Sequence, residues 1–202
     1  MRGLLTFSRT VDAFNSRIGR IVSWALLLAI LISAANATIR KIFDTSSNSW
    51  LEVQWVLFGV VFLLCAAWTL IANEHIRIDI VNNLLPKAVR NLIDVIGHLF
   101  FLLPTAFALS YLGWPFFWNS LLQNEQSTNA GGLPVYPSKL LIPLAFTLLF
   151  FQGISELIKR IAIISGKLED TVSGGGHHAA VEAEAERVLQ LAREEAEKRA
   201  QG

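Results

Sequence analysis

The chain has 202 residues, 53% of them hydrophobic, and a formal net charge of +1. Charged residues make up only 16%, against about 25% in a soluble domain, and this hydrophobicity excludes a disordered protein. No basic face stands out against the acidic residues, so we expect no nucleic-acid partner. The one cysteine, Cys65, permits neither an intramolecular disulfide nor a cysteine-based zinc site.

Four apolar runs are each long enough to cross a lipid bilayer, which takes about 20 residues. They lie at about 21–39, 53–72, 92–113 and 140–158. We therefore predict an all-α membrane protein with four transmembrane helices. It would consist of a cytoplasmic N-terminal segment over 1–20, a membrane domain over 21–168, and a linker with a charged helical tail over 169–202.

The distribution of basic residues predicts the orientation. Ten Lys and Arg residues border the runs on the side of the two termini, against three on the other side. Because such residues concentrate on the cytoplasmic side of a membrane, both termini are predicted to be cytoplasmic. An alternative reading is a signal peptide, since an arginine-rich start and an apolar stretch precede Ala35-Asn36-Ala37. Its cleavage would leave three spans.

The sequence contains no recognisable catalytic motif, such as a phosphate-binding loop or a paired zinc-histidine motif. Only His98 lies inside a predicted span, and a bis-histidine haem needs two buried histidines. We therefore expect no cofactor. The adjacent His177 and His178 lie beside glycines with no third ligand nearby, and we interpret them as part of a solvated linker.

Ionisable and polar groups at the ends of the spans are functional candidates, because charge is costly in hydrocarbon. Glu52 and Gln54 begin the second span: either they cap the helix in the interfacial layer, or they contact a second membrane protein. Asp94 and His98 share one helix face and form either a local pair or a partner contact. The charged residues at the end of the fourth span are interpreted as solvated; these are Glu156, Lys159 and Arg160.

Two loops carry further signals. In the cytoplasmic loop after the second span, Ile76, Ile78 and Ile80 alternate with charged residues, which suggests an amphipathic segment on the membrane surface. In the outer loop over 124–137, Gly131-Gly132 allows a tight turn and the following prolines stiffen the chain. This loop either docks an extracytoplasmic protein or simply connects two spans. We also expect small residues of the second and third spans, such as Ala67, to mediate helix packing.

The second span and the loop after it resemble a known family. The matching residues are Trp50, Glu52, Gln54 and Gly59, then His75-Ile76-Arg77-Ile78-Asp79 and Leu85-Pro86. With the order of four spans over about 15–168, they resemble the small permease subunit of a tripartite ATP-independent periplasmic (TRAP) transporter, the DctQ-like family. A second stretch is similar to the branch associated with mannitol, chloroaromatic or 2-oxo acid systems: Glu125, Ser127, Asn129, Gly131-Gly132-Leu133, Pro137, Ile142-Pro143 and Gln152-Gly153.

The resemblance implies a non-catalytic subunit of a sodium-coupled secondary transporter for organic acid anions in a bacterial inner membrane. A periplasmic binding protein captures the substrate, and a large permease subunit carries it across by an elevator movement. The small subunit braces the static scaffold of the large one and contributes to docking the binding protein. The alternatives are an integral membrane redox or other enzyme subunit, and a stand-alone assembly factor.

The residues that we expect to contact these partners come from the second and third spans and from the two loops. They are Trp50, Glu52, Gln54, Gly59, His75, Arg77, Asp79, Asp94, His98, Glu125, Gly131 and Gly132.

Overall fold

The computed structural model describes residues 2–45, 47–72, 86–166 and 168. This part of the chain folds into helices joined by short connections, and its order is α1 (Arg2–Phe43), α2 (Asn48–Leu64), α3 (Ala66–Ala72), α5 (Lys87–Gly97), the π-helical turn η1 (His98–Leu102), α6 (Leu103–Leu122) and α7 (Tyr136–Ile164). The predicted tail over 169–202 lies outside the described residues.

Four stretches are long and apolar enough to cross a membrane: Gly3–Phe43, Asn48–Ala72, Val89–Leu122 and Tyr136–Ile164. Each contains one of the four predicted runs, so the prediction of an all-α protein with four membrane-spanning helices is confirmed. The described residues contain one isolated β-bridge and no strand.

The first helix is much longer than the apolar run that predicted it. Residues 2–20, predicted as a separate segment, form the first half of α1 and continue without a break into the apolar half. No proline interrupts this region, and a single helix therefore carries both the arginine-rich start and the first span. Residues 2–20 differ from the rest of α1 in their charge, not in their backbone conformation.

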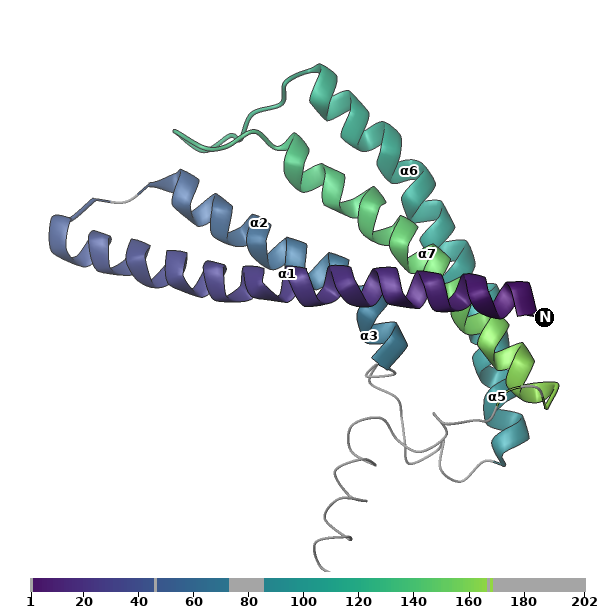
Figure 1. The fold of residues 1–202 in the computed structure, drawn as a ribbon. Helices are drawn as coiled ribbons and strands as arrows, with labels where there is room; N and C mark the ends of the chain where they lie inside the picture. Colours follow the sequence, from purple (N-terminus) through teal and green to yellow (C-terminus); the bar gives the residue numbers. More distant parts are fainter. Residues whose placement is uncertain (1, 46, 73–85, 167, 169–202) are drawn as a thin grey trace, which may run out of the picture.

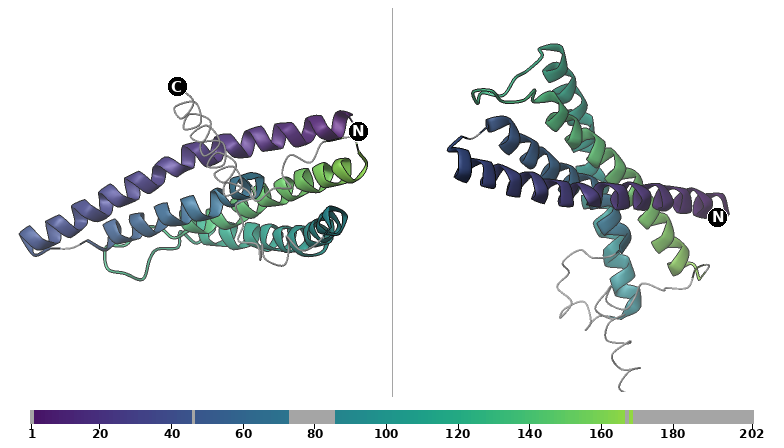
Figure 2. Two further views of the ribbon diagram at one scale, coloured as in Figure 1. Left: turned by 90° about the horizontal axis from the view of Figure 1, so that it is seen from below. Right: turned by 60° about the vertical axis from the view of Figure 1, so that its left-hand side comes forward.

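The helices form two antiparallel hairpins (Figure 1). α1 pairs with α2 and α3, while α5, η1 and α6 pair with α7, which contacts every other element. α1 crosses α7 obliquely, and Figure 2 shows the same crossing from two other directions. The connection between α1 and α2 and the loop between α6 and α7 lie at one end, which we call the outer end. The N-terminus, the end of α3 and the end of α7 lie at the opposite, inner end.

Small residues allow the helices to approach closely. Ala67 and Ala106 are almost fully buried, which agrees with the packing role expected for small residues of these spans. Gly113 lies so close to α7 that an added Cβ would be 3.1 Å from the Cβ of Pro143. At Gly19 the same atom would lie 2.6 Å from the Trp68 ring, so no larger residue fits at this crossing of α1 and α3.

Proline shapes the third span. Pro104 has no N–H, and the carbonyl of Phe100 therefore loses its usual helical partner. The chain widens into the π-helical turn η1 just before this point, where the Leu103 N–H donates to the carbonyl of His98. The span stays continuous, and His98 is buried in its first third, near the inner end.

Candidate functional site

Polar side chains gather at both ends of the two hairpins. At the outer end, the start of α2 binds the loop between α6 and α7; we call this contact the outer clasp. It consists of Asn48, Ser49, Glu52, Ser127, Asn129, Ala130, Gly131 and Leu133. At the inner end, the first half of α1 binds α7; we call this contact the inner seam. It consists of Ser8, Asp12, Asn15, Gln152, Ser155, Glu156 and Lys159.

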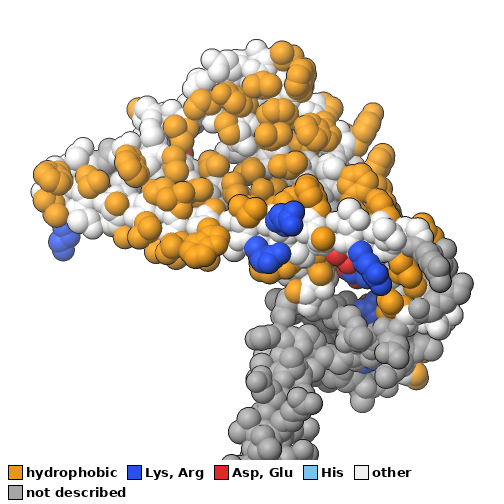
Figure 3. Space-filling model, in the orientation of Figure 1, with side chains coloured by type: hydrophobic (Ala, Val, Ile, Leu, Met, Phe, Trp, Pro, Cys, Tyr) orange, Lys and Arg blue, Asp and Glu red, His pale blue; other side chains and the backbone are white. Residues whose placement is uncertain are grey.

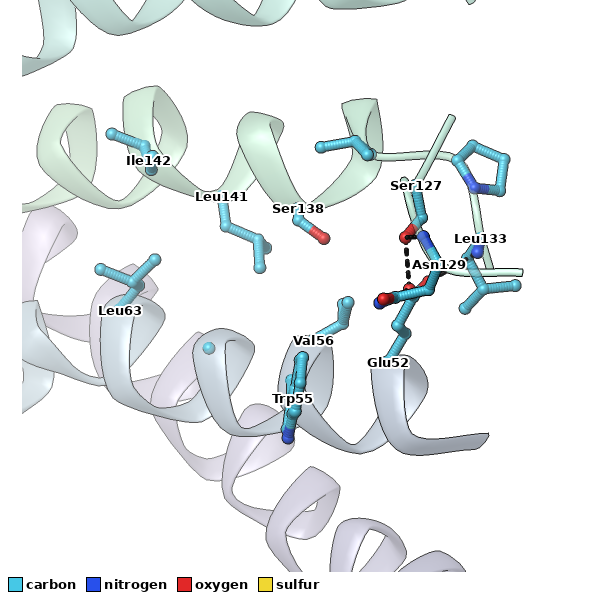
Figure 4. A pocket seen from close by; sticks show the side chains of 13 residues that line it. Glu52, Trp55, Val56, Leu63, Ser127, Asn129, Leu133, Ser138, Leu141 and Ile142 are labelled. Atoms are coloured by element: carbon cyan, nitrogen blue, oxygen red, sulfur yellow. Dashed lines mark hydrogen bonds between the residues drawn. The ribbon is translucent and has the colours of Figure 1, made fainter. Parts of the chain in front are cut away.

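Glu52 is the centre of the outer clasp (Figure 4). Its Oε2 accepts the backbone N–H of Leu133 at 2.6 Å, and its Oε1 accepts the Asn129 side-chain amide at 2.8 Å. The hydroxyl of Ser127 also donates to Oε1. The carboxylate therefore holds the outer loop rather than the first turn of its own helix, which corrects the capping interpretation.

The loop is folded to present these donors. The N–H of Gly132 donates to the carbonyl of Asn129 at 3.0 Å, and the N–H of Ser127 donates to the carbonyl of Leu133 at 3.0 Å. Gly131 has a φ of +70°, which confirms the tight turn predicted at this position. At Gly132 an added Cβ would lie 2.6 Å from Ser127 Cβ and 2.7 Å from Glu52 Oε1, so the close approach of both residues requires glycine here.

Two further contacts fix the loop. Within the clasp, the Asn48 side-chain amide donates to the carbonyl of Ala130 at 2.9 Å. At the base of the loop, Lys139 of α7 forms an ion pair with Glu125. The Lys139 ammonium, which donates a hydrogen bond to this carboxylate, lowers the pKa of Glu125 below its usual value. Lys139 Nζ also lies 4.2 Å from the centroid of the Phe116 ring, a cation–π contact.

A pocket of about 390 Å³ lies beneath the clasp, between α2 and α7. Its walls are mostly apolar, and they include Val56, Gly59 and Leu141. Figure 4 shows the polar groups Glu52 and Asn129 together at one end, where they hydrogen-bond to each other. The remaining wall suits an apolar group, such as a side chain or an acyl chain.

The inner seam joins the first and last helices of the described chain. Ser8 and Ser155 bring their hydroxyls to 2.7 Å, and the Asn15 side-chain amide donates to Gln152 Oε1 at 2.8 Å. Gln152 and Ser155 are fully buried. Ser8, Asp12 and Asn15 recur at helical spacing, and they therefore lie on one face of α1.

The charged members of the seam pair with one another. Lys159 Nζ lies 3.0 Å from Asp12 Oδ2 and 2.5 Å from Glu156 Oε1. The Lys159 side chain is 23% exposed and that of Glu156 only 14%. The interpretation of these two residues as solvated is therefore wrong, because α1 covers this end of α7.

Arg160 is a third member of the group that was expected to be solvated, and it is only 7% exposed. Its Nη2 lies 3.1 Å from Asp94 Oδ2, and its Nη1 donates to Asn91 Oδ1 at 3.2 Å. The His98 ring donates through Nδ1 to the backbone carbonyl of Asp94 at 2.6 Å. His98 therefore binds the backbone of Asp94, while the Asp94 carboxylate engages Arg160 of α7.

The other predicted contact residues are spread along the chain. Trp50 is exposed at the outer end, and Gln54 is half-buried one turn of helix further on. His75, Arg77 and Asp79 lie outside the described residues, together with the predicted amphipathic loop. In the ranges that the structure describes, no group of three or more His, Cys, Asp or Glu side chains could hold a metal ion.

Sequence reasoning missed the α1 half of the inner seam. The signal was present in the regular spacing of Ser8, Asp12 and Asn15, but it can be read only once residues 2–20 are known to be helical.

Comparison with known proteins gives one match. The family model described as "Tripartite ATP-independent periplasmic transporters, DctQ component" matches residues 29–162. The matched region contains the outer clasp, the pocket and the α7 residues Gln152, Ser155, Glu156 and Lys159, but it begins after the α1 half of the inner seam. No curated protein and no solved structure matches the chain.

Proposed function

The chain belongs to the DctQ family of TRAP transporter components, and from this premise we propose that it braces the static scaffold of a large permease subunit in a transporter for organic acid anions. In this proposal the chain has no catalytic role and binds no substrate. Movement of substrate, coupled to sodium, takes place in the large subunit. A periplasmic binding protein delivers the substrate.

The observation that carries this proposal is the closure of the two hairpins at both ends. The outer clasp joins α2 to the loop before α7, and the inner seam joins α1 to α7. An elevator moves one domain against another, and the static part therefore needs a support that does not deform. Two hairpins fastened at both ends meet that requirement.

The apolar surface supports the same proposal. Most residues in the most apolar stretch of each span are not buried within the chain. Membrane helices associate through close packing rather than by escaping water, and exposed helix faces can therefore pack against lipid or against another membrane protein. In our proposal the large permease subunit covers part of this surface, and the bilayer covers the rest.

The ionisable groups within the membrane helices favour a support over a transport pathway. Asp12 pairs with Lys159, and Asp94 pairs with Arg160. Proton and ion pathways depend on ionisable groups that face a water-filled cavity. Here the pairs join one helix to another, which is a structural use of charge.

We further propose that both termini lie in the cytoplasm and that the membrane is the bacterial inner membrane. The outer clasp then faces the periplasm, where the ordered loop over 123–135 can contribute to docking the binding protein. Glu52, Glu125, Gly131 and Gly132 would act indirectly, because their contacts hold this loop in shape. Trp50 is exposed nearby and would touch a partner directly.

The proposal is tested by co-expression with a large TRAP permease subunit and a periplasmic binding protein from the same genome. We expect the chain to co-purify with the large subunit and uptake in proteoliposomes to require all three proteins. Uptake by this chain alone would overturn the proposal. A bound chromophore in its visible absorption spectrum would instead favour the alternative of a redox enzyme subunit.

A variant pair tests the docking role. Glu52→Ala removes the centre of the outer clasp. Asp44→Asn removes an exposed charge near the same end of the molecule and keeps a residue that tolerates the φ of 49° at this position. We expect Glu52→Ala to lower uptake at limiting binding protein several-fold and to leave co-purification with the large subunit intact. Equal uptake by both variants would contradict a docking role for the clasp.

A further inference from the structure

The first half of α1 lies alongside the inner ends of the other helices. Ser8 contacts Ser155, about two and a half turns before α7 ends at Ile164. Gly19 packs under Trp68, about one turn before α3 ends at Ala72. These contacts are about 16 Å apart along α1, yet both are made near the inner end. α1 therefore runs obliquely across this end, as Figure 1 shows, and does not project straight beyond it.

This half of α1 has three different faces. The first carries the small and polar residues that meet α7 and α3, from Ser8 to Gly19. The second is apolar: Phe7 is 41% exposed and Phe14 is 58% exposed, and two turns of helix place them on one side. The third is basic and carries Arg9, Arg17 and Arg20, all exposed. At 100° per residue these arginines fall within about 80° of one another, roughly a third of a turn from the two phenylalanines.

The basic face is not neutralised by the rest of the helix. Asp12 is the only acidic residue before Asp44 in the sequence. Its carboxylate accepts hydrogen bonds from Ser155 and Gln152 and pairs with Lys159. Figure 3 shows Lys and Arg side chains gathered over the N-terminal half of α1, on a face of the molecule that is otherwise mostly hydrophobic.

From this arrangement we propose that residues 4–20 of α1, which continue obliquely from the first span, pass through the headgroup layer at the cytoplasmic surface of the membrane and bind anionic phospholipid headgroups through Arg9, Arg17 and Arg20. Phe7 and Phe14 point toward the acyl chains, while the arginines extend to the phosphates. An apolar face beside a basic face is typical of helices that lie in the membrane interface, and arginine side chains reach the headgroup layer from such a position. The placement on the cytoplasmic side rests on the orientation proposed above.

The lipid selectivity of the full chain tests the proposal. The protein is reconstituted in phosphatidylcholine bilayers with trace spin-labelled phosphatidylglycerol or phosphatidylcholine, and the fraction of each lipid immobilised at the protein is measured. We expect the wild-type protein to select phosphatidylglycerol over phosphatidylcholine. The variants Arg9→Gln and Arg17→Gln should each lower this selectivity by up to about fivefold.

The matched control removes the same charge from the other end of the same helix, by Arg40→Gln and Lys41→Gln. A loss of selectivity in the control equal to that in the arginine variants would overturn the proposal, as would an absence of selectivity in the wild-type protein. Since both leaflets contain the same lipids, the result does not depend on orientation. A negative result in this lipid measurement therefore bears on the lipid-binding proposal alone. Failure of the chain to co-purify with the large subunit bears on the proposed function.

A depth measurement tests the position of the helix independently. In a Cys65→Ala background, single spin labels are placed at Phe7 and at Ala13, which lies one turn from both Arg9 and Arg17. We expect the label at Phe7 to be accessible to oxygen and shielded from a water-soluble nickel chelate, and the label at Ala13 to show the reverse. Equal access of the nickel chelate to both labels would mean that the first half of α1 projects into water. This result would overturn the proposal.

Discussion

Asp12 of α1 and Lys159 of α7 form an ion pair of 3.0 Å, although 147 positions separate them in the sequence. The second Asp12 oxygen accepts hydrogen bonds from Ser155 at 2.8 Å and from Gln152 at 2.7 Å. This one carboxylate therefore ties the first helix of the chain to the last span through three donors.

Asp12→Asn is expected to weaken this tie. Asparagine keeps one oxygen acceptor but loses the charge that attracts Lys159, and hydrogen bonds to charged groups contribute about 2 kcal/mol. The free energy of unfolding, measured by titration with SDS in detergent micelles, should fall by about that amount. Asp44→Asn is the control, because Asp44 is exposed at the other end of α1. A similar loss in both variants would contradict a specific role for Asp12.

The pair between Asp94 and Arg160 predicts a different pattern. Asp94→Leu leaves the buried Arg160 charge without its ion-pair partner, which should lower stability by about 3–5 kcal/mol. The double variant Asp94→Leu with Arg160→Met removes both charges and should regain most of that loss. The same SDS titration measures the wild type, Asp94→Leu, Arg160→Met and the double variant. If the double variant is as unstable as the sum of the single variants, the two residues do not depend on each other.

The two loop glycines should behave differently when each is changed to alanine. Gly131→Ala imposes a side chain on a left-handed backbone, at about 1–2 kcal/mol, but meets no other atom within 4 Å. Gly132→Ala pushes directly against Glu52 Oε1 and should open the outer clasp. The rate of hydrogen exchange at the Leu133 amide reports this opening. This rate should rise more in Gly132→Ala than in Gly131→Ala.

A double-mutant cycle separates the two cases. Gly132→Ala should cost less in a Glu52→Ala background than in the wild type, because one of its two clashes is gone and only the one with Ser127, at 2.6 Å from the added Cβ, remains. Gly131→Ala should have the same effect in both backgrounds. Additive effects for both glycines would show that the clasp does not depend on the close approach at Gly132.

The ion pair of Glu125 and Lys139 gives the outer loop a defined response to pH. The Lys139 ammonium lowers the pKa of Glu125 from its usual value of 4.5. The pair therefore contributes fully above pH 4.5 and loses its contribution as the pH falls through the lower pKa of the folded protein. A spin label at Thr128, in a Cys65→Ala background, should keep its mobility from pH 7 to pH 5 and gain mobility only below 4.5.

Lys139→Gln is the control for this pH response. Without the ammonium, the pKa of Glu125 should return toward its ordinary value. The label at Thr128 should be somewhat more mobile than in the wild type at neutral pH, with the outer clasp still in place because Glu52 continues to bind Ser127 and Asn129. A gain in mobility between pH 7 and pH 5 in the wild-type protein would contradict the assignment of this pair as an anchor of the loop.

The four spans could be predicted because a run of about 20 apolar residues has few other uses. The outer loop was also partly readable: Gly131-Gly132 predicted the turn, and Glu52 and Glu125 were singled out as candidates. Their partners could not be predicted, because Glu52 binds the Leu133 N–H across 81 positions of sequence. Hydrogen bonds of this kind depend on how the hairpins meet, which local sequence does not specify.

The inner seam was out of reach for a related reason. Glu156, Lys159 and Arg160 follow an apolar run, and in isolation they resemble the solvated end of a helix. Glu156 and Lys159 are covered because α1 extends back to Arg2 and crosses α7 at that level, and Arg160 is buried because Asn91 and Asp94 of α5 pack against it. Their burial is thus a consequence of the length and direction of other helices, and neither quantity can be read from the residues around Arg160.

Fastening at both ends also determines how the molecule bears mechanical force. A pull on the N-terminus loads the seam residues on α1 first, while the clasp, at the far end beyond the turn into α2, carries no tension until they let go. The resistance to such a pull is therefore set first by the few polar side chains of the inner seam, near the start of the chain. The apolar helix contacts contribute only after those hydrogen bonds and ion pairs have broken.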